Sequence, residues 1–106
     1  MAEVQIVYWR DIPAVVTARD GRRERVSVNL PDRFQAAIDE AAMRAGLTGT
    51  DEYLAEWRRS EWQVLDGDSV SAARRVADEL EATYPPERLK ELIASQGKAN
   101  SDMATS

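Results

Sequence analysis

Residues 4–30 most constrain the fold, because they contain three short runs rich in β-branched and aromatic residues, which are typical of β-strands. The runs cover residues 4–9, 14–19 and 25–30. Asp20-Gly21 separates the second run from the third, and this dipeptide is a strong signal for a hairpin turn. Pro13 has no backbone N–H to donate, so we expect a turn or a sheet edge after the first run. The segment therefore predicts a three-stranded antiparallel meander.

The rest of the chain carries the signals of four helices. They are expected at about residues 31–45, 50–58, 69–84 and 86–95. Pro31 and Pro86 suit a first helical turn, and Gly46 is a natural C-cap. Asp68 or Ser69 is expected to cap the third helix. By helical spacing, the inward-facing residues are predicted to be Phe34, Ile38, Ala41 and Ala45, then Tyr53, Leu54 and Trp57, then Val70, Ala73, Ala77, Leu80 and Tyr84, and finally Leu89, Leu92 and Ile93.

Residues 61–65 alternate between polar and apolar side chains, which predicts a fourth short strand. The predicted fold class is therefore α+β, with a three- to four-stranded antiparallel meander packed against about four helices. Residues 1–95 are expected to form a single domain. Residues 96–106 are small and polar, and we expect them to be a disordered C-terminal tail.

The chain contains no cysteine and no histidine, which excludes thiol chemistry, the commonest general base and the commonest metal ligands. Asp66-Gly67-Asp68 resembles part of a calcium loop, but the glutamate that completes such a loop is missing. We therefore expect a protein that is not an enzyme, with no catalytic residues, no bound metal and no cofactor. Carboxylate, lysine, serine or tyrosine chemistry is what the composition leaves open.

The formal net charge is −5, which argues against nucleic acid as a partner because phosphate contacts supply most non-specific affinity. No apolar run approaches the length of a membrane-spanning helix, so no membrane partner is expected. The N-terminus also lacks the basic and apolar regions of a signal peptide. These features predict a cytoplasmic protein.

Two segments place tryptophan beside arginine: Tyr8-Trp9-Arg10-Asp11 and Trp57-Arg58-Arg59. Tryptophan and arginine are enriched at the centres of protein interfaces, so these seven residues are the predicted surface for another protein. The alternative is a core tryptophan next to a solvated arginine. A third hypothesis is an enzyme that uses aspartate or lysine, which a deep pocket lined by Arg10, Asp11 and Arg58 would favour.

The stretch from Arg25 to Pro31, followed by a helix, Gly46 and a second helix from Thr50, resembles a ribbon–helix–helix unit. That family binds DNA as a dimer, with alternate strand residues in the major groove. The resemblance implies the alternative DNA contacts Arg25, Ser27 and Asn29. However, residues 14–19 are available to pair with this strand within the same chain.

A second resemblance covers most of the chain. It is carried by Val4-Gln5-Ile6-Val7-Tyr8-Trp9-Arg10-Asp11-Ile12-Pro13-Ala14, Asp32-Arg33-Phe34-Gln35-Ala36-Ala37-Ile38-Asp39, Ala41 to Gly46, and Tyr53-Leu54 through Trp57-Arg58. These segments are similar to the small bacterial "virulence factor" domain family, which includes stand-alone proteins and a module of conserved virulence factor C. The resemblance implies an accessory role that supports corrinoid- and folate-dependent methyl transfer, with a methyltransferase component as the partner. It supplies no catalytic residues.

Overall fold

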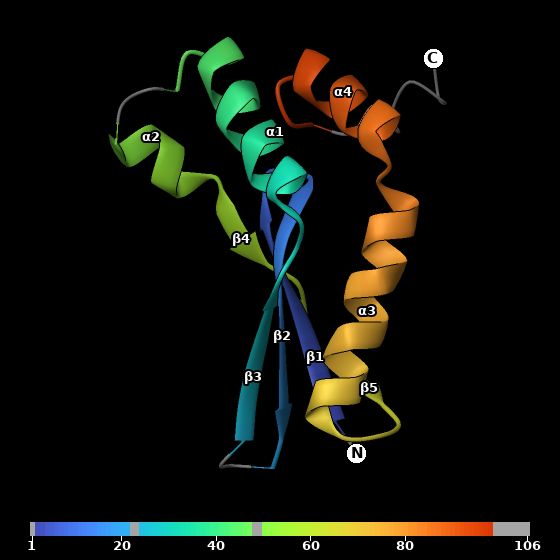
Figure 1. Ribbon diagram of the computed structural model, residues 1–106. Coiled ribbons are helices and arrows are strands. Elements are labelled where there is room, and N and C mark those ends of the chain that lie inside the picture. Colours follow the sequence, from blue (N-terminus) through green and yellow to red (C-terminus); the bar gives the residue numbers. More distant parts are fainter. Residues whose placement is uncertain (1, 22–23, 48–49, 99–106) are drawn as a thin grey trace, which may run out of the picture.

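The computed structural model describes residues 2–21, 24–47 and 50–98 (Figure 1). In chain order the elements are β1 (Ala2–Trp9), β2 (Ile12–Asp20), β3 (Glu24–Asn29), α1 (Asp32–Arg44), α2 (Thr50–Ala55), β4 (Trp57–Arg59), β5 (Gln63–Leu65), α3 (Ser69–Thr83) and α4 (Pro86–Ala94). The α+β class and the antiparallel meander are confirmed, with a sheet of five strands in the described residues.

The strands are ordered β3-β2-β1-β4, and β5 also pairs with β1, so β4 and β5 share one edge of the sheet. Arg58 of β4 is opposite Tyr8, and Val64 of β5 is opposite Glu3. Between them Ser60 continues the edge, because its backbone N–H donates to Ile6 O and its hydroxyl accepts from Ile6 N. The last predicted strand is therefore confirmed at residues 63–65, and a further strand lies before it.

The first turn is tighter than the sequence suggested. Trp9 pairs with Ile12, which leaves only Arg10 and Asp11 in the loop between β1 and β2. Pro13 lies inside β2, a central strand, where we had expected a turn or an edge. The pairing of β1 with β2 shifts between Val7 and Tyr8, and Pro13 lies at this bulge. A bulge interrupts the ladder, so the missing proline N–H is tolerated there.

The two faces of the sheet differ. Ala2, Val4, Val16 and Ala18 are buried, and they point toward α3, whose buried side includes Ala73 and Ala77. Residues of the opposite parity are exposed or half-buried from Glu3 to Val7 of β1, from Val15 to Arg19 of β2 and along β3, so the described helices leave this part of the other side open to solvent. We call it the outer face. Its strand residues are Glu3, Gln5, Val7, Val15, Thr17, Arg19, Arg25, Ser27, Asn29, Arg59 and Val64.

The remaining helices gather at the end of the sheet where β1 turns into β2 (Figure 1). α1 packs against α4, and both contribute buried side chains such as Phe34, Ile38 and Leu92. The inner sides predicted for α1 and α4 are thus largely confirmed. In α3 the prediction of Val70 was wrong: Val70 is 56% exposed and the neighbouring Ser69 is fully buried. The inward-facing side of α3 therefore begins at Ser69 and not at Val70.

The second predicted helix was too long. α2 ends at Ala55, and Trp57 and Arg58 belong to β4, not to the helix. Residues 96–98, which we had assigned to a disordered tail, are described and are packed against the first turn: Asp11 N donates to Gly97 O at 2.8 Å. Residues 99–106 of the predicted tail lie outside the described residues.

Gly97 allows this close approach. Its φ is +87°, and a Cβ added there would lie 2.8 Å from Cζ3 of Trp9. Gly46, which ends α1, has a similar φ of +75° but open space around it.

We expect Gly46→Ala to lower the free energy of unfolding by about 1 kcal/mol, the cost of the left-handed backbone alone. Gly97→Ala carries the same backbone cost and a clash with the buried indole, so it should cost about 1 to 3 kcal/mol more. Urea denaturation of both variants, followed by tryptophan fluorescence, measures the difference. Equal effects of the two substitutions would show that residue 97 does not pack on Trp9.

Candidate functional site

The predicted Trp/Arg surface is brought together around the first turn, but its tryptophans are not its exposed part. Trp9 is completely buried, and its indole N–H donates to Tyr53 O at 3.0 Å. Its ring stacks on Tyr53 at 5.7 Å between centroids, and Trp57 meets the same tyrosine edge-on at 6.1 Å. Trp57 is half-buried. For Trp9 the core alternative is correct, and Trp9 is removed from the predicted interaction surface.

Arg10 is held in an unusual conformation. Its φ of +53° is rare for a residue with a side chain and costs on the order of 1 kcal/mol, so its surroundings must stabilise it. Its backbone N–H donates to Glu56 O at 3.0 Å, and its side chain donates to Gln96 O at 2.8 Å. The Arg10 side chain is only 11% exposed, and its Nε lies 3.3 Å from Glu56 Oε1, without the alignment of a hydrogen bond. Arg10 is thus a structural anchor.

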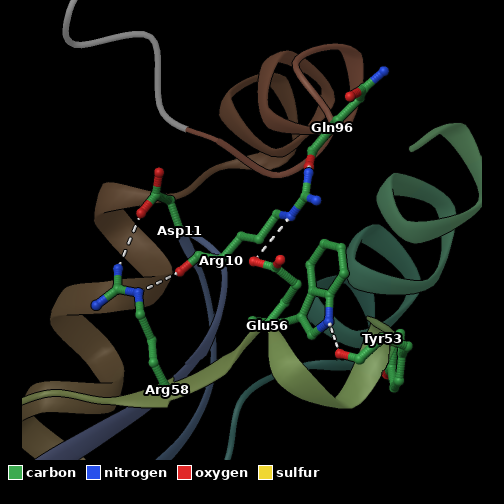
Figure 2. A network of polar contacts seen from close by, with 7 residues as sticks. Arg10, Asp11, Tyr53, Glu56, Arg58 and Gln96 are labelled. Carbon is green, nitrogen blue, oxygen red and sulfur yellow. Dashed lines mark hydrogen bonds and ion pairs between the residues drawn. The ribbon is translucent and has the colours of Figure 1, made fainter. Parts of the chain in front are cut away.

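Arg58 closes the turn from the side of β4. Its Nε donates to Arg10 O at 2.8 Å and its Nη2 to Asp11 Oδ1 at 3.0 Å, as Figure 2 shows. The guanidinium also lies 4.5 Å from the ring centre of Tyr8. We call Arg10, Asp11, Glu56 and Arg58 the turn cluster. It joins β1, the end of α2, β4 and the segment after α4 at one point.

A pocket of about 410 Å³ opens beside the turn cluster, lined by Arg10, Asp11, Ala55, Glu56, Arg58 and Lys98. A pocket with Arg10, Asp11 and Arg58 was the feature expected of an enzyme. Here both carboxylates lie within ion-pair distance of a guanidinium, Asp11 of Arg58 and Glu56 of Arg10. Carboxylates paired in this way help to hold the chain together, and Lys98 also lines the pocket.

Two tyrosines lie near the other side of Arg58. Burial is the main cause that raises the pKa of both Tyr8 and Tyr84 above the usual value. The charge of Tyr84 further raises the pKa of Tyr8, and Arg58 lowers it. For Tyr84, Arg88 lowers the pKa, Asp11 raises it and Arg58 lowers it, in decreasing order of effect. Both hydroxyls therefore stay protonated at neutral pH and can donate hydrogen bonds.

The outer face carries the side chains that remain free to meet a partner. Arg25 and Arg59 are exposed, and neither forms an ion pair with another described residue. A hollow of about 560 Å³ lies next to Arg59, lined by Val7, Trp57, Arg58 and Arg59. Of the predicted surface, Trp57, Arg58 and Arg59 thus border one cavity.

Trp62 is a part of the outer face that was not among the seven residues of the predicted surface. The guanidinium of Arg19 lies 3.8 Å from its ring centre, and that of Arg25 lies 5.9 Å away. Arg19 is also paired with Glu3 at 2.8 Å, so Arg19 is committed to the fold. The stacking depends on the loop between β4 and β5, which no local pattern indicates.

The three residues of the DNA-binding alternative, Arg25, Ser27 and Asn29, are exposed side by side on β3. Their setting is not that of a ribbon–helix–helix unit, because β3 pairs with β2 of the same chain and is covered by α3. Thr50 begins α2, which has only 6 residues. The fold resemblance to that family is therefore wrong.

Asp66 and Asp68, the fragment of a calcium loop, serve the start of α3. Asp68 accepts a hydrogen bond from Ser71 N at 2.7 Å as the N-cap, which lowers the pKa of its carboxyl group. Among the described residues there is no group of three or more acidic side chains placed to hold a metal ion. Within the same residues, no helix is long and apolar enough to cross a membrane.

Comparison with known proteins agrees with the second resemblance. The family model described as "Virulence factor" matches residues 7–93, which include the turn cluster and all the elements from β2 to α3. The chain belongs to the virulence factor family. The matched region ends just before residues 95–98, which pack on the first turn.

A relative in the virulence factor family is "Uncharacterized protein YpgR" of Bacillus subtilis (strain 168). It is 35% identical over 104 residues, a match that covers 96% of this chain and 26% of that protein. The chain thus spans about a quarter of the relative's length. No solved structure matches the chain significantly.

Arg58 and Arg59 are adjacent, yet they should differ in their effect on stability. Arg58→Ala removes hydrogen bonds to Asp11 and Arg10 O, so we expect it to lower the free energy of unfolding by about 1 to 2 kcal/mol. Arg59→Ala removes no described hydrogen bond or ion pair and should change stability by less than about 0.5 kcal/mol. Chemical denaturation of the two variants tests this. A larger effect of Arg59→Ala would contradict the role of Arg58 as the closing residue.

The tyrosine pair predicts a loss of stability in alkali. Because the pKa of each is raised in the folded state, the unfolded chain releases these protons first, and the free energy of unfolding falls as the pH rises above about 10. The double variant Tyr8→Phe/Tyr84→Phe should show a shallower fall between about pH 9 and 11. Both proteins keep Lys90 and Lys98, so lysine titration is common to the two curves. Identical slopes would mean that the two hydroxyls are not shielded from water.

Proposed function

We propose that this domain is a non-catalytic accessory module that binds another protein through its outer face. The observation that carries the proposal is a sheet with one side covered by α3 and the other open, where Arg25 and Arg59 have no described ion-pair partner. A one-sided antiparallel sheet of this kind is a rigid platform for contact residues.

The charges of the outer face favour an acidic partner. The whole chain is acidic, with a net charge of −5, but Arg25 and Arg59 lie on the outer face and form no ion pair with another described residue. Complementary charge would steer an acidic segment to this side of the molecule and disfavour basic ones.

The hollow beside Arg59 adds an apolar contact. Its lining includes Val7 and the half-buried Trp57, and it is bordered by the guanidinium groups of Arg58 and Arg59. Apolar side chains that enter such pockets often dominate binding, with charged contacts at the rim. The partner segment that fits best has an apolar residue next to acidic ones.

The resemblance to the virulence factor family suggests where to look for the partner. We propose a component of corrinoid- and folate-dependent methyl transfer as the first candidate to test. In this proposal the domain has no catalytic step of its own, and the pocket beside the turn cluster serves the structure.

The test is an affinity capture from the native host, in which the retained protein is identified and its affinity then measured with purified components. We expect the double charge reversal Arg25→Glu/Arg59→Glu to weaken binding by at least about tenfold. The control Arg74→Glu/Lys90→Glu makes the same change of charge on exposed residues of α3 and α4 and should bind as the wild type does. Binding should also weaken as salt is raised.

Two outcomes would count against this function. Equal loss of affinity in both double variants would show that net charge, and not the outer face, governs binding. Retention of labelled duplex DNA at low salt, reduced by Arg25→Ala, would favour the DNA-binding alternative instead.

A further inference from the structure

The outer edge of β3 is unpaired in the described chain. β3 lies at one end of the strand order, so it has β2 on one side only. Leu30 N donates to Ala14 O, so the alternate residues Val28 and Val26 also direct their backbone groups toward β2. The N–H and C=O groups of Arg25, Ser27 and Asn29 therefore point away from the sheet. An open row of this kind is a template for another strand.

We propose that the occupant of this edge is β3 of a second copy, paired antiparallel about a two-fold axis at Ser27. In this register Ser27 is opposite Ser27 of the partner subunit, and Arg25 is opposite Asn29 of the partner subunit. Each outward residue then exchanges both of its backbone hydrogen bonds, so all the outward groups of β3 are used. A register centred on Val26 would pair Arg25 with Ser27 and leave Asn29 beyond the end of the strand.

The side chains of this register fit a second copy of the same sequence. On the side covered by α3, Val26 would meet Val28 of the partner subunit, and both valines are only half-buried in the single chain. On the outer face, Arg25 would meet an asparagine and not another arginine. Like charges directly opposite each other destabilise a sheet, and this register has none.

The two-fold axis is perpendicular to the sheet, so it leaves both outer faces on the same side of one continuous sheet. The dimer thus presents two copies of the surface assigned above to an acidic partner. Self-association by β3 does not depend on that function, since it uses the backbone edge and not the exposed guanidinium groups.

Single-cysteine variants test the register directly, because the chain contains no cysteine of its own. In Ser27→Cys the two Cα atoms would be roughly 5.5 Å apart across the axis, within disulfide range. We expect rapid cross-linking under mild oxidation. The matched control Asn29→Cys is exposed on the same strand and face, yet its partner would be about 13 Å away or more, so it should not cross-link with itself. A mixture of Arg25→Cys and Asn29→Cys should form the mixed disulfide.

A proline tests the role of the backbone. Ser27→Pro removes an N–H that points away from β2, which an edge strand tolerates, and its ring blocks the approach of another strand. Sedimentation of the full chain over a range of concentrations should show a dimer for the wild type and for Ser27→Ala. Ser27→Pro should raise the dissociation constant of the dimer by about tenfold or more while its circular dichroism spectrum is retained.

The effect of salt concentration distinguishes self-association from the binding of an acidic partner. Copies with net charge −5 repel each other, so higher salt should leave the dimer unchanged or strengthen it. A wild type that stays monomeric up to about millimolar concentration, where even weak association is detectable, would overturn the proposal. So would equal cross-linking of the Ser27→Cys and Asn29→Cys variants. Should Ser27→Pro fail to fold, the cross-linking result still decides.

Discussion

The burial of Trp9 is the interaction on which the rest of the structure depends. Its indole is packed against Tyr53 on one side and Gly97 on another, and its N–H is satisfied by Tyr53 O. A fully buried tryptophan removes one of the largest apolar surfaces from water, and its hydrogen bond avoids the penalty of an unsatisfied donor. Through this one side chain, the end of β1, the helix α2 and the segment after α4 are held together.

The turn cluster lies directly beside the buried indole. Because Trp9 pairs with Ile12, the loop has only two residues, and Arg10 adopts a left-handed conformation that its contacts with Glu56 and Gln96 stabilise. Arg58 then completes the arrangement from β4. The arginines near the turn thus stabilise the fold, whereas Arg25 and Arg59 form no ion pair with another described residue. The distinction between the two groups comes from geometry, since all of them are arginines in polar surroundings.

Local patterns predicted the elements whose formation is local. The meander follows from alternation and from Asp20-Gly21, and α1 follows from Pro31 and Gly46, because turns and caps depend on residues close in sequence. β4 could not be predicted in this way. Trp57 and Arg58 suit a helix equally well, and the pairing of Arg58 with Tyr8 decides the outcome. In the same way, nothing around Gly97 indicates its contact with Trp9, which is a matter of tertiary packing.

For the same reason, the candidate site could be predicted only in part. The sequence indicated the correct two segments, but Trp9 is buried by Tyr53 of α2 and by the segment around Gly97, which lie far from it along the chain. Whether Trp9 belongs to the core or to a surface is therefore a matter of tertiary packing. The outer face, with Trp62 above Arg19, is visible only once the strands are in register.

The contacts of the first turn also determine the order in which parts of the domain can fold during synthesis. Trp9 and Tyr53 are 44 residues apart, and Arg10 and Gln96 are 86 apart. At a synthesis rate of about 5 to 20 residues per second, the last of these partners follows the first by roughly 4 to 17 s. The strands β1 to β3 leave the ribosome early, but the indole at their turn stays uncovered on one side until the segment around Gly97 has emerged. For the nascent chain, that interval is when an exposed tryptophan at the tip of a hairpin is open to chaperones and to wrong contacts.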